Sequence, residues 1–378
     1  MSGAWGSIPH MTTPSIKLTR SPLAPTPMEL DAQQDAAVAH RGSPLLIAGG
    51  PGTGKTSVLI AAALSRITAG QDPDSILLLT YGRQRASELR DAIALRTTST
   101  MHEPLARTFH SLAYSILKMN SGDSYHEPIL LSGPEQENFI EQLLQGDVED
   151  GYRQWPDDLH DGEDKKGNPL LTQGFIRELR DLIMRANERG ISPDELAQRG
   201  KTVGEKYWAP AADFWQRYKQ VMAIREDAAG DAKMRIDPSE LISVTIAHLL
   251  ANEDLRAQLQ ARFKTIMVDE YQESDPAQRA LLALLTGSDL VIAYDADSAV
   301  GRFRGADPDG LKGEVDKYLA QGATQILLAN SYRSCPEIFE VARAVVSQFR
   351  APSPTRQRTC TYLEKPALDN AFSAARLR

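Results

Sequence analysis

Apolar runs of four or five residues alternate with helical patterns in both outer parts of the chain. The run at 44–48 leads into a helix at 57–66, and the run at 76–80 leads into a polar helix at 84–95. Short apolar runs bounded by loops and helices are typical of strands buried on both faces of a parallel sheet. The pattern therefore predicts an α/β fold with strands at 44–48, 76–80, 265–269, 290–294 and 325–328 and another helix at 28–38.

The middle of the chain, from 111 to 236, has no strand-like alternation of apolar and polar residues. Apolar side chains keep helical spacing in two stretches, which predicts a small helical core. These stretches are Leu171, Phe175, Ile176, Leu179, Leu182 and Ile183, and Trp208, Ala211, Trp215, Tyr218 and Met222. Residues 147–168 are acidic and aperiodic, which indicates a surface loop. We expect an all-helical unit inserted into the sheet domain.

Composition narrows the class of protein. A net charge of −8 over 378 residues argues against a generally basic, nucleic-acid-binding surface, but it leaves a local basic track open. Two cysteines, Cys335 and Cys360, form neither a disulfide framework nor a metal-binding set. No stretch approaches the roughly 18 apolar residues of a membrane span, and the start of the chain lacks a signal pattern. We expect a globular, cytoplasmic protein with no membrane partner.

Residues 49–56, GGPGTGKT, fit the pattern G-x-x-x-x-G-K-[ST] of a phosphate-binding loop. They lie between a predicted strand and a predicted helix, as this loop requires. Glycines let backbone N–H groups approach phosphate oxygens, and the helix N-terminus adds partial positive charge. Lys55 is expected to contact the β- and γ-phosphates of ATP, and Thr56 to bind Mg²⁺. The expected nucleotide-binding residues are Gly49, Gly50, Pro51, Gly52, Thr53, Gly54, Lys55 and Thr56.

An acidic pair closes the strand expected at 265–269. Asp269 would bind Mg²⁺, and Glu270 would orient or deprotonate the attacking water. Such a pair after a strand is often a solvated turn. The phosphate-binding loop in the same chain favours the catalytic interpretation.

Further segments, in their order along the chain, resemble motifs of superfamily 1 DNA helicases of the UvrD/Rep/PcrA type. The motifs other than the phosphate loop are Leu30-Asp31-Ala32-Gln33-Gln34 (the Q motif), Thr80-Tyr81 (motif Ia), Thr108-Phe109-His110-Ser111 (motif Ib), Val268-Asp269-Glu270-Tyr271-Gln272 (motif II), residues 295–307 (motif III) and Ser331-Tyr332-Arg333-Ser334 (motif IV). The resemblance implies a RecA-like P-loop parallel sheet domain, called 1A, with an inserted helical subdomain, called 1B.

The resemblance also implies the domain boundaries. The expected parts are a flexible tail at 1–28, domain 1A at 29–110 and 237–322, the helical insertion 1B at 111–236, the start of a second RecA-like domain, 2A, at 323–350, and an aberrant or truncated tail at 351–378.

Roles for individual residues follow from the same resemblance. Gln34 would read the adenine edge, Tyr332 would stack on adenine, and Arg333 would reach the γ-phosphate. Gln272 would couple the nucleotide to the DNA side. The residues expected to contact single-stranded DNA are Thr80, Thr108, Phe109, His110, Phe303 and Arg304. Three alternatives stay open: a core position for Phe303, a structural role for His110 and a surface ion pair for Arg333.

Several positions depart from the family's motifs. Ser298 stands where the family has a glutamine that senses the γ-phosphate, and Ser57 stands where many relatives have an arginine. Residues 82–86 read Gly-Arg-Gln-Arg-Ala instead of T-N-K-A-A, and Ser331 replaces an asparagine. This erosion is similar to the AdnA-type subunit of actinobacterial helicase-nucleases, which implies a second subunit as partner. Because motifs V and VI are missing, a truncated or frame-shifted product is expected.

We therefore predict the ATP-binding, DNA-contacting part of an ATP-dependent helicase, which couples ATP hydrolysis to single-strand translocation and unwinding in DNA repair or recombination. The expected ligands are ATP, Mg²⁺ and single-stranded or duplex-end DNA. One alternative is a vestigial, non-motor subunit that binds DNA or a partner. Another is an unrelated P-loop kinase or regulator, which would lack segments like 108–111 and 332–334.

Overall fold

The computed structural model describes residues 29–119, 127–152, 154–159, 168–229, 233–287, 289–346 and 361–362. The tail expected at 1–28, and nearly all of the one expected at 351–378, lie outside these residues. A six-stranded sheet with the order β3-β2-β6-β7-β1-β8 forms the centre, and every neighbouring pair is parallel. Its strands are β1 (Leu45–Gly49), β2 (Ile76–Thr80), β3 (Ala106–Thr108), β6 (Thr265–Val268), β7 (Asp289–Tyr294) and β8 (Thr324–Leu328).

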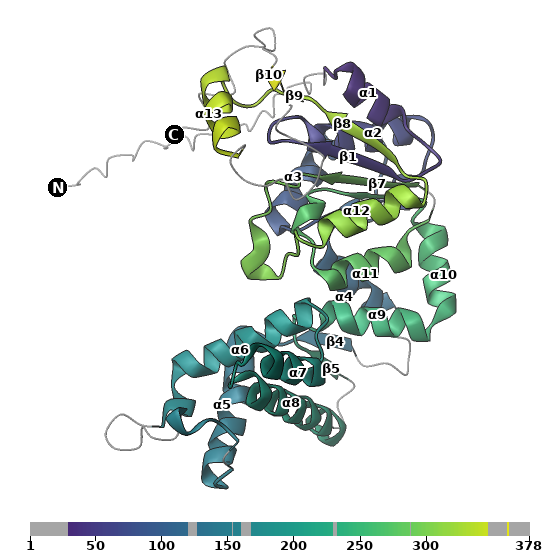
Figure 1. Ribbon diagram of the computed structural model, residues 1–378. Helices are drawn as coiled ribbons and strands as arrows, with labels where there is room; N and C mark the ends of the chain where they lie inside the picture. The colour runs from purple at the N-terminus through teal and green to yellow at the C-terminus, as the bar shows by residue number, and fades with distance from the viewer. Residues whose placement is uncertain are drawn as a thin grey trace, which may run out of the picture.

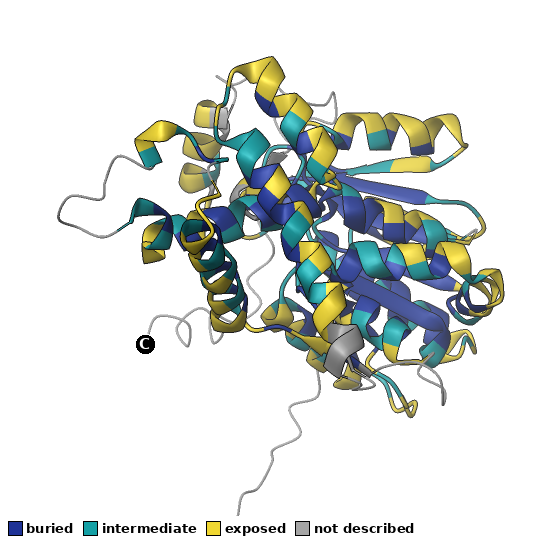
Figure 2. Ribbon diagram, turned by 90° about the horizontal axis from the view of Figure 1, so that it is seen from below, coloured by how far each residue is buried: buried dark blue, intermediate teal, exposed yellow. Residues whose placement is uncertain are grey.

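Helices cover both faces of this sheet (Figure 1). Leu45 and Ile47 of β1 pack against one helical layer, whereas Leu46 and Ala48 pack against the other, because successive side chains of a strand point to opposite faces. The first layer holds α1 (Ala32–Ala39), α2 (Lys55–Thr68) and α3 (Arg83–Ala94), and the second holds α4 (Phe109–Met119), α9 (Leu241–Ala251), α10 (Glu253–Arg262), α11 (Pro276–Leu285) and α12 (Leu311–Ala320). Figure 2 shows buried strands between helices with exposed outer faces. The α/β fold class is confirmed.

Three details of the sheet unit differ from the expectation. β3 was not predicted, because three residues are too few for a recognisable apolar run. β8 was expected to open a second domain, but it pairs with β1 from Leu45↔Thr324 to Gly49↔Leu328 and is an edge strand of the first sheet. The helix expected from 28 starts at Ala32, because Asp31 caps it by accepting hydrogen bonds from the N–H groups of Gln33 and Gln34.

The inserted unit has its own hydrophobic core. Its helices are α5 (Gly133–Glu149), α6 (Gln173–Glu188), α7 (Pro193–Val203) and α8 (Trp208–Ala229). Ile176 and Leu179 of α6 pack with Phe214 and Trp215 of α8, so both predicted helical stretches face this core. Trp155, from the predicted surface loop, is also buried in it. Figure 1 shows this unit beside the sheet unit, as a separate group of helices.

The inserted unit is not entirely helical, so that expectation is wrong in one detail. β4 (Glu127–Leu130) and β5 (Lys233–Ile236) form a parallel two-stranded ribbon where the chain enters and leaves the unit. The two connections run side by side, so their backbone groups hydrogen-bond to each other. β4 has no alternating pattern, and the alternation of β5 (Lys233-Met234-Arg235-Ile236) covers only four residues, so neither was predicted as a strand.

The remaining elements are short or follow the sheet. Beyond β8 come β9 (Asn330–Ser331), which pairs with β10 (Thr361–Tyr362), and α13 (Pro336–Val346). Single 3-10 turns are η1 (Pro73–Ser75), η2 (Asp157–Leu159), η3 (Pro169–Leu171), η4 (Tyr271–Glu273) and η5 (Gly301–Arg304). Within the described residues, no helix combines the length and apolar character needed to cross a membrane.

Candidate nucleotide-binding site

The phosphate-binding loop connects the carboxyl end of β1 to the amino end of α2. Gly52 and Gly54 have φ of +79° and +82°, where a Cβ atom would be strained. A Cβ on Gly52 would also lie 2.6 Å from Cβ of Arg333, and one on Gly54 would lie 2.5 Å from Nε2 of Gln34. Both positions therefore need glycine for backbone conformation and for the close approach of neighbouring segments.

The Lys55 side chain lies along this loop. Its Nζ donates to the carbonyl oxygens of Gly49, at 2.8 Å, and Gly50, at 3.0 Å. It also lies 3.7 Å from Oδ2 of Asp295, at the carboxyl end of β7. Lys55 is only 7% exposed. The ammonium group is thus held at the sheet edge where open α/β folds bind ligands.

Thr56 and Asp269, the two expected Mg²⁺ ligands, meet although 213 residues separate them. Thr56 Oγ1 donates to both carboxylate oxygens of Asp269, at 3.1 Å to Oδ2 and 3.3 Å to Oδ1. Adjacent ligands of an octahedral Mg²⁺ with bonds of 2.0–2.1 Å lie about 2.9 Å apart. The spacing of these oxygens therefore fits a shared magnesium ion.

Asp269 is fully buried, with an exposed fraction of 0%. Burial and then the neighbouring Glu270 carboxylate raise its pKa, whereas Arg85, Thr56 and Lys55 act in the opposite direction. A bound divalent cation would favour the charged form of such a carboxylate. The electrostatics agree with the geometry of a metal position.

Glu270 and Gln272 follow Asp269 and connect two strand ends. Glu270 has φ of +56°, the only positive φ of a non-glycine residue in the described part of the chain. Gln272 Nε2 donates to Glu270 Oε2 at 2.5 Å, and Gln272 Oε1 accepts from the N–H of Asp295 at 2.9 Å. Gln272 also lies 3.4 Å from Oγ of Ser298. It therefore links the acidic turn after β6 to the segment after β7.

Asp295 belongs to the site but was named only as part of a longer segment. It is 1% exposed, and burial raises its pKa while Lys55 lowers it. Asp295 follows β7 just as Asp269 follows β6, and the two strands are neighbours in the sheet. That repeated position after a strand was the signal that could have identified it from sequence.

The segment resembling motif IV crosses the phosphate loop. Ser331 Oγ donates to the Pro51 carbonyl at 2.8 Å, and the Tyr332 N–H donates to the Gly52 carbonyl at 2.9 Å. The Tyr332 hydroxyl donates to Asp31 at 2.6 Å. Arg333 is exposed, and its guanidinium has no hydrogen-bond or ion-pair partner among the described residues. Tyr332 and Arg333 therefore lie next to the loop, and their contacts with adenine and the γ-phosphate stay predictions.

Gln34 lies behind the loop instead of facing an open base pocket. It is 3% exposed; Nε2 donates to the Thr53 carbonyl at 2.9 Å, and Oε1 accepts from the Asp31 N–H at 2.9 Å. Both ends of the amide are thus used within the protein. The structure does not place Gln34 for reading adenine, because the same groups brace the loop against α1.

The sequence of the chain matches a known protein family. The family described as the UvrD/REP helicase N-terminal domain matches residues 30–318, which include the loop, Asp269 and the whole inserted unit. The chain belongs to the UvrD/REP helicase family. The recognition of a UvrD-type superfamily 1 helicase from sequence is confirmed.

Similar relatives carry helicase names. The chain is 28% identical over 349 residues to ATP-dependent DNA helicase UvrD1 of Mycobacterium tuberculosis, covering 86% of this chain and 41% of the relative. It is 26% identical over 321 residues to DNA helicase II of Escherichia coli, covering 84% and 40%. A putative ATP-dependent DNA helicase, YjcD of Bacillus subtilis, is 28% identical over 332 residues, covering 84% and 38%. The chain thus spans about two fifths of the length of these relatives.

A groove in this UvrD/REP-type chain collects part of the expected DNA-contacting set. It has a volume of about 760 Å³ and lies between the sheet unit and the start of the inserted unit. Thr108 and His110 line it. Protein atoms around the ring and the charge of Arg83 lower the pKa of His110. The expectation for these two residues thus has a structural counterpart, an open groove.

Two other residues expected to contact DNA, Thr80 and Phe109, are buried in this structure. Thr80 and Phe109 are each 1% exposed. The Phe109 ring stacks on Tyr81, with ring centroids 5.2 Å apart, and packs in the core below the groove. Helix α4 turns Phe109 inward while His110 lines the groove, so DNA contacts by Thr80 and Phe109 stay predictions without a structural counterpart. The side chains of Phe303 and Arg304 lie outside the described part of the structure.

Arginines supply the positive charge of the groove, and sequence reasoning did not assign them this role. Arg83, Arg90 and Arg107 line it. Arg90 donates to the Ala106 carbonyl at 3.0 Å, whereas the exposed Arg83 guanidinium has no hydrogen-bond or ion-pair partner among the described residues. Their placement depends on β2, α3 and β3 lying side by side, which the local pattern did not reveal.

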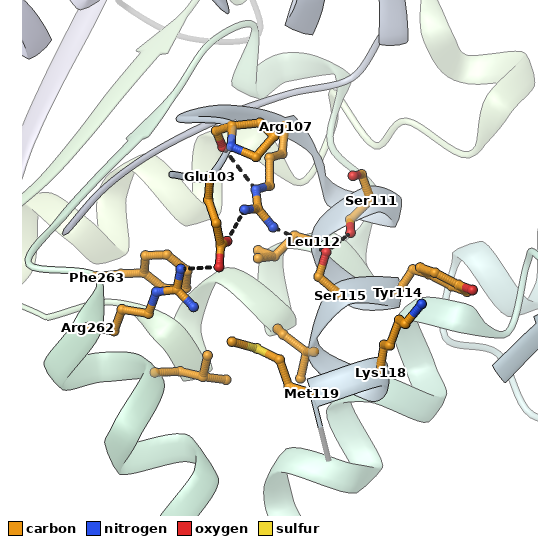
Figure 3. A pocket seen from close by; sticks show the side chains of 13 residues that line it. Glu103, Arg107, Ser111, Leu112, Tyr114, Ser115, Lys118, Met119, Arg262 and Phe263 are labelled. Atoms are coloured by element: carbon orange, nitrogen blue, oxygen red, sulfur yellow. Dashed lines mark hydrogen bonds and ion pairs between the residues drawn. The ribbon is translucent and has the colours of Figure 1, made fainter. Parts of the chain in front are cut away.

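Arg107 also lines a second hollow, which lies beside α4 (Figure 3). There Glu103 lies between Arg262, at 2.6 Å, and Arg107, and these two arginines lower the pKa of Glu103. Phe263 and Met119 add apolar surface to this hollow. Arg107 thus has a carboxylate partner, whereas Arg83 and Arg90 form no ion pair among the described residues, and of these two only Arg90 also donates to a backbone carbonyl.

Proposed function

We propose that this chain binds ATP together with Mg²⁺ at the loop 49–56 and contacts single-stranded DNA in the groove lined by Arg83, Thr108 and His110. The observation that carries the nucleotide part is the pairing of Thr56 with Asp269 beside Lys55. The groove, with its unpaired Arg83, supports the DNA part. The names of the relatives support a role in ATP-dependent helicase action.

Each residue of the site has a role in this proposal. Lys55 binds the terminal phosphates, and Thr56 and Asp269 hold Mg²⁺, which would neutralise charge on the transferred phosphoryl group. Glu270 orients the attacking water; its φ of +56° turns the backbone sharply just after the metal-binding Asp269. Arg333, which lies against Gly52, binds the γ-phosphate, and Tyr332 stacks on the base.

Translocation, unwinding and a role in repair or recombination belong to the proposal as well. So does a second helicase-nuclease subunit as partner. The full motor requires a second domain that closes on the nucleotide. In this proposal the chain provides the first half of that machinery.

Calorimetric titration of the purified chain with ATP tests the nucleotide part. With Mg²⁺ present, we expect saturable binding, followed by hydrolysis that rises when single-stranded oligonucleotide is added. A chain that binds no ATP at millimolar concentration with Mg²⁺ would contradict the proposal.

A second candidate function is a DNA- or partner-binding subunit with vestigial hydrolysis. Ser298 favours it: its short hydroxyl side chain lies 3.4 Å from Gln272, inside the acidic turn, in place of a longer sensing side chain. This candidate predicts ATP binding with negligible turnover, even with DNA. Brisk, DNA-stimulated turnover by the chain alone would rule it out.

A further inference from the structure

Arg85 contacts both expected metal ligands. It extends from the first turn of α3, and its NH2 group donates to Thr56 Oγ1 at 2.6 Å. Its Nε donates to Asp269 Oδ2 at 3.3 Å. Its third nitrogen, NH1, lies 3.2 Å from Glu88, one turn further along α3. One planar guanidinium thus spans the hydroxyl and the carboxylate that would share Mg²⁺.

A divalent cation and this guanidinium cannot use the same oxygens together. Mg²⁺ would need Thr56 Oγ1 and a carboxylate oxygen of Asp269 at 2.0–2.1 Å, free of other cations. Arg85 already binds that hydroxyl and Oδ2 of the carboxylate. Occupation by one cation therefore excludes the other.

Asp269 needs a counter-charge when no metal is bound. An isolated, fully buried carboxylate is strongly unfavourable. Lys55 points its Nζ to the Gly49 and Gly50 carbonyls, and its ion pair is with Asp295. Among the described residues, Arg85 forms the ion pair with Asp269.

We propose that Arg85 is the resident cation of the metal position in the nucleotide-free chain, and that Mg²⁺ binds only as Arg85 leaves. This inference rests on the proposed role of Thr56 and Asp269 as metal ligands. The Arg85 side chain is 35% exposed and has Glu88, which is 51% exposed, as a partner outside the site, so an exit path is open. Mg²⁺ alone then binds weakly, and ATP phosphates help to displace Arg85, which makes metal and nucleotide binding cooperative.

Direct metal binding to the full chain tests this proposal. Mn²⁺, a spectroscopic substitute for Mg²⁺, is titrated without nucleotide, and free Mn²⁺ is counted by electron paramagnetic resonance. We expect Arg85→Ala to bind Mn²⁺ roughly tenfold more tightly than the unaltered chain, because the competing cation is gone. Arg256→Ala is the matched control, since Arg256 forms a comparable exposed pair with Glu253 on α10. It should leave the affinity unchanged.

Cooperativity gives a second measurement. The affinity for a fluorescent ATP analogue is measured with Mg²⁺ and with EDTA. Arg85→Ala should lower the ratio of the dissociation constant in EDTA to that in Mg²⁺ roughly tenfold, because the metal then binds the nucleotide-free chain without having to displace Arg85. Arg85→Lys keeps the charge without the planar fork, so its ratio should lie between those of the unaltered chain and Arg85→Ala. It serves as the test variant if Arg85→Ala does not fold.

The outcomes separate this inference from the proposed function. Equal Mn²⁺ affinity with and without Arg85, together with loss of binding in Asp269→Asn, would overturn the inference and keep the metal site. If Asp269→Asn leaves Mn²⁺ affinity unchanged in the Arg85→Ala background, the metal position is wrong and both proposals fall. A chain that binds Mn²⁺ as expected but no ATP contradicts only the nucleotide proposal.

Discussion

The sheet unit and the inserted unit differ in what their cores do. In the sheet unit, the two apolar clusters end at the carboxyl edge of the strands, where Lys55, Asp269 and Asp295 are buried. In the inserted unit, the core is built of apolar and aromatic side chains such as Phe214 and Trp215. The first unit therefore holds the candidate site, whereas the second has an apolar core, and Leu130 and Leu131 at its start line the groove.

The seam between the units includes polar contacts. Asn187 at the end of α6 donates to Ser239 at 3.1 Å. The next residue, Glu188, packs against Gly305, where a Cβ would lie 2.7 Å from its Oε2. That oxygen has no hydrogen-bond partner among the described residues. The two units thus have separate hydrophobic cores and meet at contacts that include a buried carboxylate.

The largest effect should come from breaking the inserted core. Phe214 is 0% exposed, and Phe214→Ala should cost about 3–5 kcal/mol of the stability of the inserted unit, because it leaves a large cavity. Tryptophan fluorescence during urea unfolding measures this, since Trp155, Trp208 and Trp215 all lie in that unit. ATP binding should persist.

Val203→Ala is the control for this change, because Val203 is 67% exposed and its loss should be nearly neutral. If Phe214→Ala loses ATP binding at temperatures where the sheet unit stays folded, the nucleotide site depends on the inserted core. The expected independence of the two units would then be wrong.

Lys55→Ala should break the sheet unit's site without affecting the inserted unit. Removing the ammonium should weaken ATP binding by roughly 100-fold, because a charge-assisted contact to the phosphates is lost. Calorimetry measures the affinity, and tryptophan fluorescence should report an unchanged inserted unit. Lys312→Ala, which removes an exposed lysine of α12, is the control. Undiminished affinity in Lys55→Ala would contradict the site.

The seam should make stability depend on pH. Burial and then the nearby Asp275 raise the pKa of Glu188 from 4.5 to about 7; Asp181 acts in the same direction, and Arg185 and Arg189 oppose it. The folded pKa lies above the unfolded value, so the folded state favours the protonated carboxyl of Glu188. The contribution of this group to stability is complete below about pH 4.5 and is lost as the pH rises through 7.

Glu188→Gln should therefore raise stability at pH 8 by roughly 1–2 kcal/mol and flatten the loss between pH 5 and 8; solvent screening keeps the gain below the full pKa shift. Thermal melting across this pH range measures it. Asp275, whose pKa burial also raises to about 7, should leave a residual slope. Glu178→Gln on the same helix is the control, and an identical pH profile in Glu188→Gln would argue against a charge-sensitive seam.

The smallest expected effect concerns the groove that both units form. Arg83→Ala should weaken binding of an oligothymidine strand roughly fivefold and lower the salt slope by about 0.7, because one phosphate contact is lost. Fluorescence anisotropy at several salt concentrations measures both. Arg256→Ala should leave affinity and slope unchanged. A changed affinity with an unaltered slope would mean that Arg83 does not contact phosphate.

Local patterns predicted the strands that are long and apolar, and the helices between them. They missed β3, β4 and β5, whose few residues are held by pairing with distant partners. They also misassigned β8, because nothing in its apolar residues says which sheet it joins.

The candidate site divides in the same way. The loop at 49–56, Asp269 and Glu270 were predicted, because each motif is contiguous and follows a strand. The inward turn of Phe109, the bracing role of Gln34 and the position of Arg85 were not, because each depends on which neighbouring segment lies beside it.

By itself, the sequence determined that this chain has a phosphate-binding loop, an acidic partner and the motif order of the UvrD/REP helicase family, since these depend on contiguous residues and their spacing. Only the tertiary structure decided that Arg85 joins Thr56 and Asp269, and that Arg83 and Arg90 line the groove. The physical reason is that parallel pairing of β2 with β6 sets α3 beside the nucleotide site, and no local pattern encodes that neighbour.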